Sequence, residues 1–314
     1  MIPIRSVFSC NLEQELWNIR AAIDRCPLVS IDTEFPGTIY KQDRRPDPHD
    51  SITNYQFMKA NVDELKIIQL GLTLSDAQGN RRCVWEFNFQ DFDIDSDLHD
   101  KDSIELLKKQ GIDFLKNRES GIDSREFAAK IWISNLLSNH SLSWITFHGA
   151  YDFGFLMKIV TQQKLPFNLP EFKYQLLGCF GSRIINLKHT VHGGLERVAE
   201  NLTVGRVAGM SHQAGSDSLL TLDCFIELRK RGCFVKSEDS GLMQAPFGLY
   251  GLVSKPCWTP LGRCSPPLRG LYGNGIVGIV SKPRWVPLGG CSAPLAAAPW
   301  RPNPFIAIRP FNLV

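Results

Sequence analysis

The sequence lacks long hydrophobic runs and paired cysteines. No apolar stretch reaches the roughly 18 residues that a membrane-spanning helix needs. The N-terminal segment MIPIRSVFSC does not contain the uninterrupted apolar core of a signal peptide. The nine cysteines form no CxxC pair and no cluster with histidine, which indicates reduced thiols and not a disulfide framework. These absences predict a soluble, intracellular protein.

Acidic residues are missing from the last quarter of the chain. Residues 241–314 contain seven lysines and arginines but no aspartate or glutamate, whereas residues 1–240 hold the other 28 basic residues and all 32 acidic ones. The body of the protein therefore has a net charge of −4. A mildly acidic body has no general affinity for a polyanion, so any contact with nucleic acid must be local or mediated by metal ions.

The same C-terminal segment has an unusual composition. It holds 12 of the 19 prolines and 10 of the 25 glycines, and residues 248–268 match residues 275–295 at 14 of 21 positions. Two copies are too few for a solenoid. The composition predicts disorder, with a peptide-like binding element that uses the tryptophan of each copy as the alternative. We expect a folded domain over residues 1–240 and a basic Pro/Gly-rich tail over residues 241–314.

Hydrophobic periodicity predicts the order of elements within the first 240 residues. The expected strands are residues 28–35, 65–74 and 82–89, which form an antiparallel meander, and residues 143–147. The expected helices are residues 11–25, with Asn11 as the N-cap, and residues 103–117, 124–139, 152–164, 195–202 and 216–232. Residues 41–63 are polar and contain two prolines, so they are expected to form a loop over the functional site. This order predicts an α/β fold in which helices flank a mixed sheet.

The segment LVSIDTEFPG, residues 28–37, brings two carboxylates to one place. In a strand, Asp32 and Glu34 point to the same face and lie roughly 6.6 Å apart, at about 3.3 Å per residue. Two acids at this separation can share a proton or share a cation. This segment alone does not decide between the two possibilities.

Two later segments add acids and a histidine. WITFHGAYDFGFL, residues 144–156, places Asp152 after an apolar strand, where a helix begins. SHQAGSDSLL, residues 211–220, places His212 in a loop and Asp217 in the first turn of a helix. Helix N-termini favour ionised carboxylates, which suit hard divalent cations. A loop histidine can accept a proton from an attacking water.

The four carboxylates together predict a metal centre. Each acid alone has a plainer interpretation, as an exposed residue at a strand end or as a helix cap. Four ionised carboxylates without a cation would repel one another strongly. Two metals about 3.5–4 Å apart can stabilise both the attacking and the leaving oxygen of a phosphoryl displacement. We therefore expect a pair of divalent cations whose ligands are Asp32, Glu34, Asp152 and Asp217.

These segments resemble the DEDD superfamily of 3′→5′ exonucleases. The spacing between His212 and Asp217 is similar to that of the DEDDh subclass. Over about residues 5–235, the chain resembles more specifically the Caf/Pop-type deadenylase subunit of the CCR–NOT complex, in a plant-like form. This closer resemblance rests on the segments IDTEFPG, KIIQLGLTLSDAQGN, WITFHGAYDFGFLMK, GGLERVAENL and SHQAGSDSLLT.

The resemblance implies a ribonuclease-H-like fold and a poly(A)-specific 3′→5′ exoribonuclease that shortens messenger-RNA tails and releases 5′-AMP. It implies two Mg²⁺ or Mn²⁺ ions on the four acids, with His212 as general base, so that all five residues are catalytic. It also implies single-stranded poly(A) RNA as substrate, a helical scaffold subunit and a second nuclease as partners, no membrane, and work in the cytoplasm and nucleus. Phe35, Tyr151 and Phe153 are candidates for stacking on bases, but core packing is expected for at least one of them, and alternation places Phe35 on the face opposite the acids.

Two departures from the family pattern and two alternative functions stay open. Ile185 and Asn186 stand where the family usually has Tyr-Asp, which predicts a change in packing or local hydrogen bonding. The chain also continues well beyond the point where the family normally ends. A catalytically inactive adaptor of the same complex is one alternative, and a DNA-directed DEDDh exonuclease is the other.

Overall fold

The computed structural model describes residues 2–43, 47, 49–236, 243–244, 249 and 251–252. The tail predicted for residues 241–314 therefore lies outside the described residues, except for five positions at its beginning. Within the described part of the chain, no helix is long and apolar enough to cross a membrane.

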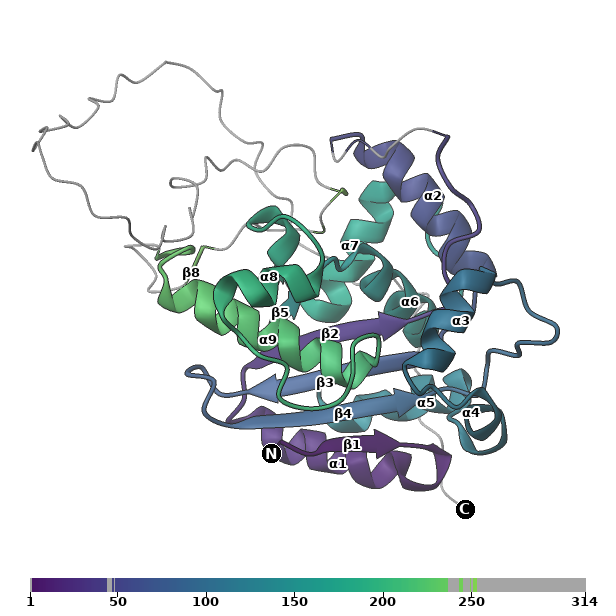
Figure 1. Ribbon diagram of the computed structural model, residues 1–314, viewed down its shortest axis with the longest axis horizontal. Coiled ribbons are helices and arrows are strands. Elements are labelled where there is room, and N and C mark those ends of the chain that lie inside the picture. The colour runs from purple at the N-terminus through teal and green to yellow at the C-terminus, as the bar shows by residue number, and fades with distance from the viewer. Residues whose placement is uncertain are drawn as a thin grey trace, which may run out of the picture. The chain divides into compact units, whose positions relative to one another are not determined.

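A six-stranded mixed sheet forms the centre of the molecule, in the order β1-β4-β3-β2-β5-β6 (Figure 1). Strands β2, β3 and β4 form the predicted antiparallel meander, and β1, β5 and β6 each pair in parallel with their neighbour. The strands are β1 Ile4–Val7, β2 Leu28–Glu34, β3 Gln69–Ser75, β4 Arg82–Asn88, β5 Ser143–Thr146 and β6 Ile184–Asn186. The predicted α/β fold with a mixed sheet is confirmed.

Helices cover both faces of this sheet. The α-helices are α1 Leu12–Ile23, α2 Ser51–Glu64, α3 Lys101–Lys109, α4 Phe114–Ser120, α5 Ser124–Lys130, α6 Ala150–Thr161, α7 Leu169–Phe180, α8 Leu195–Leu202 and α9 Ala214–Lys230. Three 3₁₀ helices, η1 Ser9–Asn11, η2 Ile131–Ser134 and η3 Leu187–His189, and a two-stranded ladder of β7 Val235–Lys236 and β8 Met243–Gln244 complete the described elements.

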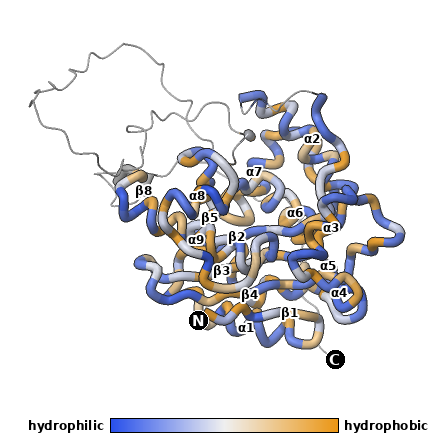
Figure 2. The backbone as a smooth tube through the Cα atoms, in the orientation of Figure 1, coloured by the Kyte–Doolittle hydropathy of each residue, from blue (hydrophilic) through white to orange (hydrophobic). Residues whose placement is uncertain are grey.

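Strand β2 separates two hydrophobic cores. Val29 and Ile31 face the larger core, which includes buried residues of α1, α2, α5, α6 and α7. Leu28 faces the smaller core, which α8 and α9 close. Ser30 and the two β2 acids share this second face, since side chains alternate along a strand. In Figure 2, hydrophobic and hydrophilic stretches alternate along the outer helices, as expected for helices that bury one side only.

The prediction of a loop over residues 41–63 is wrong, because α2 occupies most of that segment. Both prolines precede the helix, and the Asp50 side chain caps it by accepting a bond from the Thr53 amide at 3.1 Å. Tyr55, Met58 and Val62 are buried at helical spacing, and α2 packs against α6. Its polar residues obscured this narrow apolar stripe.

The two long helices predicted between residues 103 and 139 are each interrupted. The first is divided into α3 and α4 near Gly111, whose φ of +89° ends a helix readily. The second passes from α5 into η2 and stops at Asn135, which adopts a left-handed conformation. Asn11 occupies the N-cap position of α1, as predicted, but its side chain makes no capping bond and accepts one from the Phe8 amide at 2.8 Å. The sequence pattern also missed β1 and α7.

Candidate active site

Two carboxylates lie at the C-terminal end of β2. Asp32 pairs in register with Gly71 of β3, and Glu34 pairs with Gln69. Glu34 is 9% exposed, and Asp32 is half-buried. Both acids face the α9 side of the sheet, as the alternation of the strand predicts.

Gly71 allows α9 to begin directly on the sheet. A Cβ atom at this position would lie 1.8 Å from the carbonyl oxygen of Ala214, the first residue of α9. The Gly215 amide then donates to Oε2 of Glu86 on β4 at 3.1 Å. A glycine within a strand often marks such a close backbone approach. The contact places the first turn of α9, which carries Asp217, above the carboxylates of β2.

Asp152 lies at the same edge of the sheet, but it comes from α6, on the face opposite α9. Strand β5 runs parallel to β2, so the C-terminal ends of the two strands lie at one edge of the sheet. Asp152 lies in the first turn of α6, which follows β5, and it is 7% exposed. The Thr33 hydroxyl donates to its Oδ1 at 2.6 Å. This bond fixes the orientation of the carboxylate.

His212 lies in the loop before α9 with an exposed side chain and a left-handed φ of +57°. Its backbone amide donates to Oδ2 of Asp217 at 3.1 Å. Glu34, His212 and Asp217 offer potential ligand atoms that all lie within 4.8 Å of one another. The structure thus brings all five residues predicted from the sequence to one edge of the sheet.

Burial makes this cluster electrostatically unfavourable by itself. Burial, together with the neighbouring carboxylates, raises the pKa values of Asp32 and Glu34 well above their usual range. Burial raises the pKa of Asp152 to about 7, although the bond from Thr33 opposes the change. The pKa of Asp217 is also raised by burial, against the lowering effect of the Arg206 guanidinium.

These observations fit a site for divalent cations. Carboxylate oxygens are the donors that Mg²⁺ and Mn²⁺ prefer. In the described part of the chain, Asp217 alone among the four acids has an ion-pair partner, with its Oδ1 2.6 Å from Nη2 of Arg206. One arginine cannot balance four carboxylates that are buried or half-buried, so bound cations would relieve the repulsion.

Three residues that support this geometry did not emerge from the sequence. Gly71 had a usable signal, since a glycine interrupts the apolar run KIIQLGLTLS. By the alternation of the strand, Thr33 faces away from the two β2 acids, yet its hydroxyl reaches Asp152 at the edge of the sheet. Arg206 gave no signal, because its partners come from separate segments of the chain.

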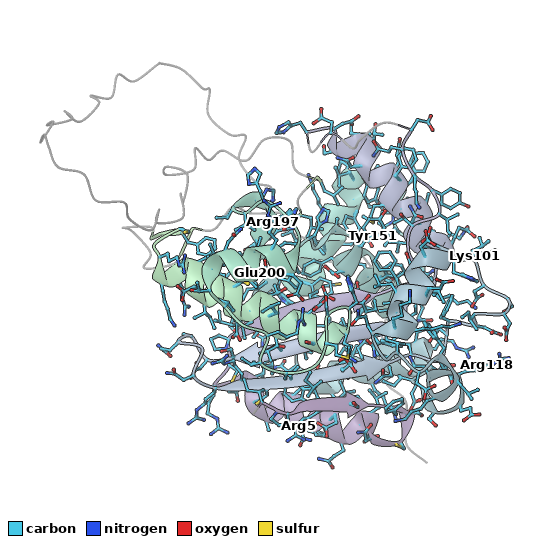
Figure 3. The ribbon with its side chains drawn as sticks, in the orientation of Figure 1. Arg5, Lys101, Arg118, Tyr151, Arg197 and Glu200 are labelled. Atoms are coloured by element: carbon cyan, nitrogen blue, oxygen red, sulfur yellow. The ribbon has the colours of Figure 1, made fainter. Side chains whose placement is uncertain are left out.

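The candidate base-stacking residues differ in their surroundings. Phe153 is fully buried, 6.0 Å from Trp144 between ring centroids, so its proposed contact with a base is wrong. Phe35 and Tyr151 stack on each other, with ring centroids 5.2 Å apart and planes inclined by 14°. Tyr151 lies at the start of α6 (Figure 3).

Asn186, at the first departure from the family pattern, is fully buried at the end of β6. Its side chain accepts a bond from the Lys188 amide at 3.1 Å and so caps η3. This local hydrogen bond lies outside the cluster of acids.

Residues 7–130 match the family model described as CAF1 family ribonuclease. The chain is 44% identical over 269 residues to the probable CCR4-associated factor 1 homolog 7 of Arabidopsis thaliana, covering 80% of this chain and 94% of the relative. It is 43% identical over 265 residues to the poly(A) ribonuclease pop2 of Schizosaccharomyces pombe, covering 82% of this chain and 77% of the relative.

Solved structures are similar along most of the same length. The Mg²⁺- and Mn²⁺-bound form of S. pombe Pop2p superposes with a TM-score of 0.71 at 42% identity, covering 80% of this chain and all of the other. Yeast CAF1, co-crystallised with the NOT1 MIF4G domain, superposes with a TM-score of 0.61 at 32% identity, covering 73% of this chain and 89% of the other.

Proposed function

This chain belongs to the CAF1 family of ribonucleases, and we propose that it removes adenylates one at a time from the 3′ end of messenger RNA. It is a poly(A) ribonuclease, a 3′→5′ exoribonuclease, and 5′-AMP is the expected product of each step. The observation that carries the proposal is the convergence of three buried carboxylates and the half-buried Asp32, from β2, α6 and α9, with the exposed His212. A buried acidic cluster of this kind is costly unless it holds cations.

The four carboxylates would hold the two divalent cations. Mg²⁺ and Mn²⁺ are bound in the S. pombe Pop2p structure, whose sequence is 42% identical to this chain. When bound, such a pair lowers the pKa of a coordinated water and offsets negative charge on the scissile phosphate. Thr33 holds Asp152 through its hydroxyl, and the contact at Gly71 holds the start of α9.

His212 is the general base in this proposal. Its side chain is exposed and can exchange a proton with solvent, whereas its backbone is tied to Oδ2 of Asp217. The imidazole would take the proton of the attacking water and return it to solvent after each turnover. The leaving oxygen is the 3′ oxygen of the shortened RNA, and the new P–O bond forms on the released 5′-AMP.

We also propose that the protein works within the CCR–NOT complex, in the cytoplasm and nucleus, beside a scaffold subunit and a second nuclease. The co-crystal of the yeast relative with the NOT1 MIF4G domain supports the scaffold partner. Co-purification of this chain with a recombinant MIF4G domain tests that partner. Failure of the two proteins to associate would contradict it.

The activity is tested with 5′-labelled RNA that ends in 20 adenosines. With Mg²⁺ or Mn²⁺ we expect stepwise shortening and 5′-AMP as product, with no shortening in the presence of a chelator. Matched RNAs that end in cytidines or uridines should be shortened more slowly, and a deoxyadenosine tail should resist cleavage, since 2′-hydroxyl contacts distinguish RNA. Equal cleavage of the DNA tail would favour the DNA exonuclease. Association with the scaffold without any turnover would favour the inactive adaptor.

A further inference from the structure

Arg206 lies in the loop between α8 and α9, and its side chain is largely enclosed, with 16% exposed. On one side, its Nε donates to Oε1 of Glu196 on α8 at 3.1 Å, and Nη2 contacts the same oxygen. Arg206 is therefore anchored to the preceding helix.

On the other side, the same guanidinium reaches the first turn of α9. Nη2 lies 2.6 Å from Oδ1 of Asp217, and Nη1 donates to the hydroxyl of Ser216. Nη1 also donates to the carbonyl oxygen of Met210 at 3.3 Å. One planar group thus joins α8, its own loop and the carboxylate proposed to hold a cation.

Arg206 holds in place the loop that also carries His212. The Ser216 hydroxyl donates to the Ala208 carbonyl at 2.6 Å, and the Met210 amide donates to the Gln213 side chain at 3.0 Å. Gln213 in turn donates to the carbonyl of Gln110 at 2.8 Å. These bonds fix the path of the loop before any ligand is present.

We propose that Arg206 is a positioning residue for the active site, one that holds Asp217 and the His212 loop in the geometry that binds cations. The proposal rests on the proposed function of the same site. Each nitrogen of the guanidinium already contacts a protein oxygen, so Arg206 has no direct part in binding RNA. Lysine cannot replace it, because an ammonium lacks the planar fork that reaches several acceptors at once.

A positioning role and a purely electrostatic role for Arg206 predict opposite effects of its removal on Mn²⁺ binding. Arg206 is a positive charge among the acids, so if it acted only by charge, its removal would strengthen Mn²⁺ binding. If it positions Asp217, its removal weakens Mn²⁺ binding, because groups that orient a metal ligand contribute about 10–100-fold to affinity or activity.

The experiment measures Mn²⁺ binding to the metal-free full-length protein without RNA, by electron paramagnetic resonance of free Mn²⁺. We expect Arg206→Gln and Arg206→Lys each to weaken binding by about 10–100-fold. The matched control is Arg231→Gln. Arg231 also joins α8 to α9, donating to the Leu202 carbonyl at 2.7 Å and to Glu227 at 2.8 Å, but at the far end of α9. This control should bind Mn²⁺ as the wild type does.

A second variant covers the case in which Arg206 variants do not fold. Glu196→Ala changes a half-exposed side chain and removes only the outer anchor of Arg206. It should keep the melting temperature of the wild type, weaken Mn²⁺ binding to a smaller extent, and lower kcat with KM for oligo(A) unchanged. Unchanged or tighter Mn²⁺ binding in the Arg206 variants, or an equal loss in Arg231→Gln, would overturn the proposal. Wild-type protein that binds Mn²⁺ but degrades no RNA would refute the proposed function and leave this comparison valid.

Discussion

At the scale of single residues, the site is built from groups that oppose folding. Burial raises the pKa values of Asp32, Glu34 and Asp152, so ionising these acids lowers the stability of the metal-free folded protein. Thr33 and Arg206 offset part of this penalty at Asp152 and Asp217. Bound cations would offset the rest of this loss of stability.

Asp152→Asn should stabilise the metal-free protein at high pH. The pKa of Asp152 rises from 3.8 to about 7 on folding, so the native state loses stability as the pH increases through this window. Asparagine imitates the protonated acid and can still accept the Thr33 bond. We expect its melting temperature in a chelator to exceed that of the wild type at pH 8, with the difference shrinking towards pH 5.

Asp95→Asn is the control, because it makes the same substitution at a side chain that is 82% exposed and lies outside the cluster of acids. Added Mn²⁺ should raise the melting temperature of the wild type more than that of Asp152→Asn, since a ligand stabilises the state that binds it. An equal difference between wild type and Asp152→Asn at both pH values would contradict this account.

The sequence revealed residues whose signal is local. Alternation placed Asp32 and Glu34 on one face, and helix starts marked Asp152 and Asp217. It did not reveal Arg206, because its partners lie on both sides of it in the sequence, in α8, in its own loop and in α9, with no regular spacing. The sequence predicts core packing for at least one of the three candidate aromatics but does not identify Phe153 as that one, since an aromatic near a site can serve either the core or a ligand.

At the scale of elements, the site depends on where two helices begin. α6 begins at the edge where β5 ends beside β2, and α9 begins on β3 at Gly71. Because α6 and α9 begin at these points, Asp152 and Asp217 approach the acids of β2 from opposite sides. The elements whose patterns were clear, such as β2 and α8, were predicted well, whereas α2 was hidden by its polar surface.

Gly71→Ala should impair the active site without touching any of its acids. The new Cβ would collide with the Ala214 carbonyl and displace the start of α9. A shift of about 1 Å in a catalytic group can lower the rate roughly 100-fold. We expect a loss of this order in the rate of 5′-AMP release.

Gly178→Ala is the matched control, because a Cβ at Gly178 in α7 meets no atom within 4 Å. It should keep the wild-type rate and gain slightly in stability, since alanine favours a helix over glycine. Wild-type activity in Gly71→Ala would show that α9 does not need its close contact with β3.

At the scale of the whole molecule, contacts of the folded core extend past residue 240. Leu249 and Leu252 are 3% and 2% exposed and pack in the larger core, and the Gly251 carbonyl accepts a bond from Asn54 of α2 at 3.1 Å. The amino-acid composition changes near residue 240, which predicts the end of the folded domain there. Two leucines in a Pro/Gly-rich segment leave no periodic signal that would extend it.

Truncation tests which residues the core needs. A chain ending at residue 252 should keep the melting temperature and the activity of the full protein, because it retains both leucines. A chain ending at residue 240 should be less stable, since burying each leucine contributes about 1.5–3 kcal/mol. Equal stability of the two truncated chains in urea unfolding would show that Leu249 and Leu252 contribute nothing.

The most direct test of the central claim is the release of 5′-AMP from an oligo(A)-tailed RNA under single-turnover conditions. It compares the wild type, Asp32→Asn and the exposed control Asp95→Asn, each with Mn²⁺ and with a chelator. We predict rapid release by the wild type and the control with Mn²⁺, and only background release by Asp32→Asn or by any of the three with chelator. Release at the wild-type rate by Asp32→Asn, or by the wild type in the chelator, would contradict a metal-dependent site on these carboxylates.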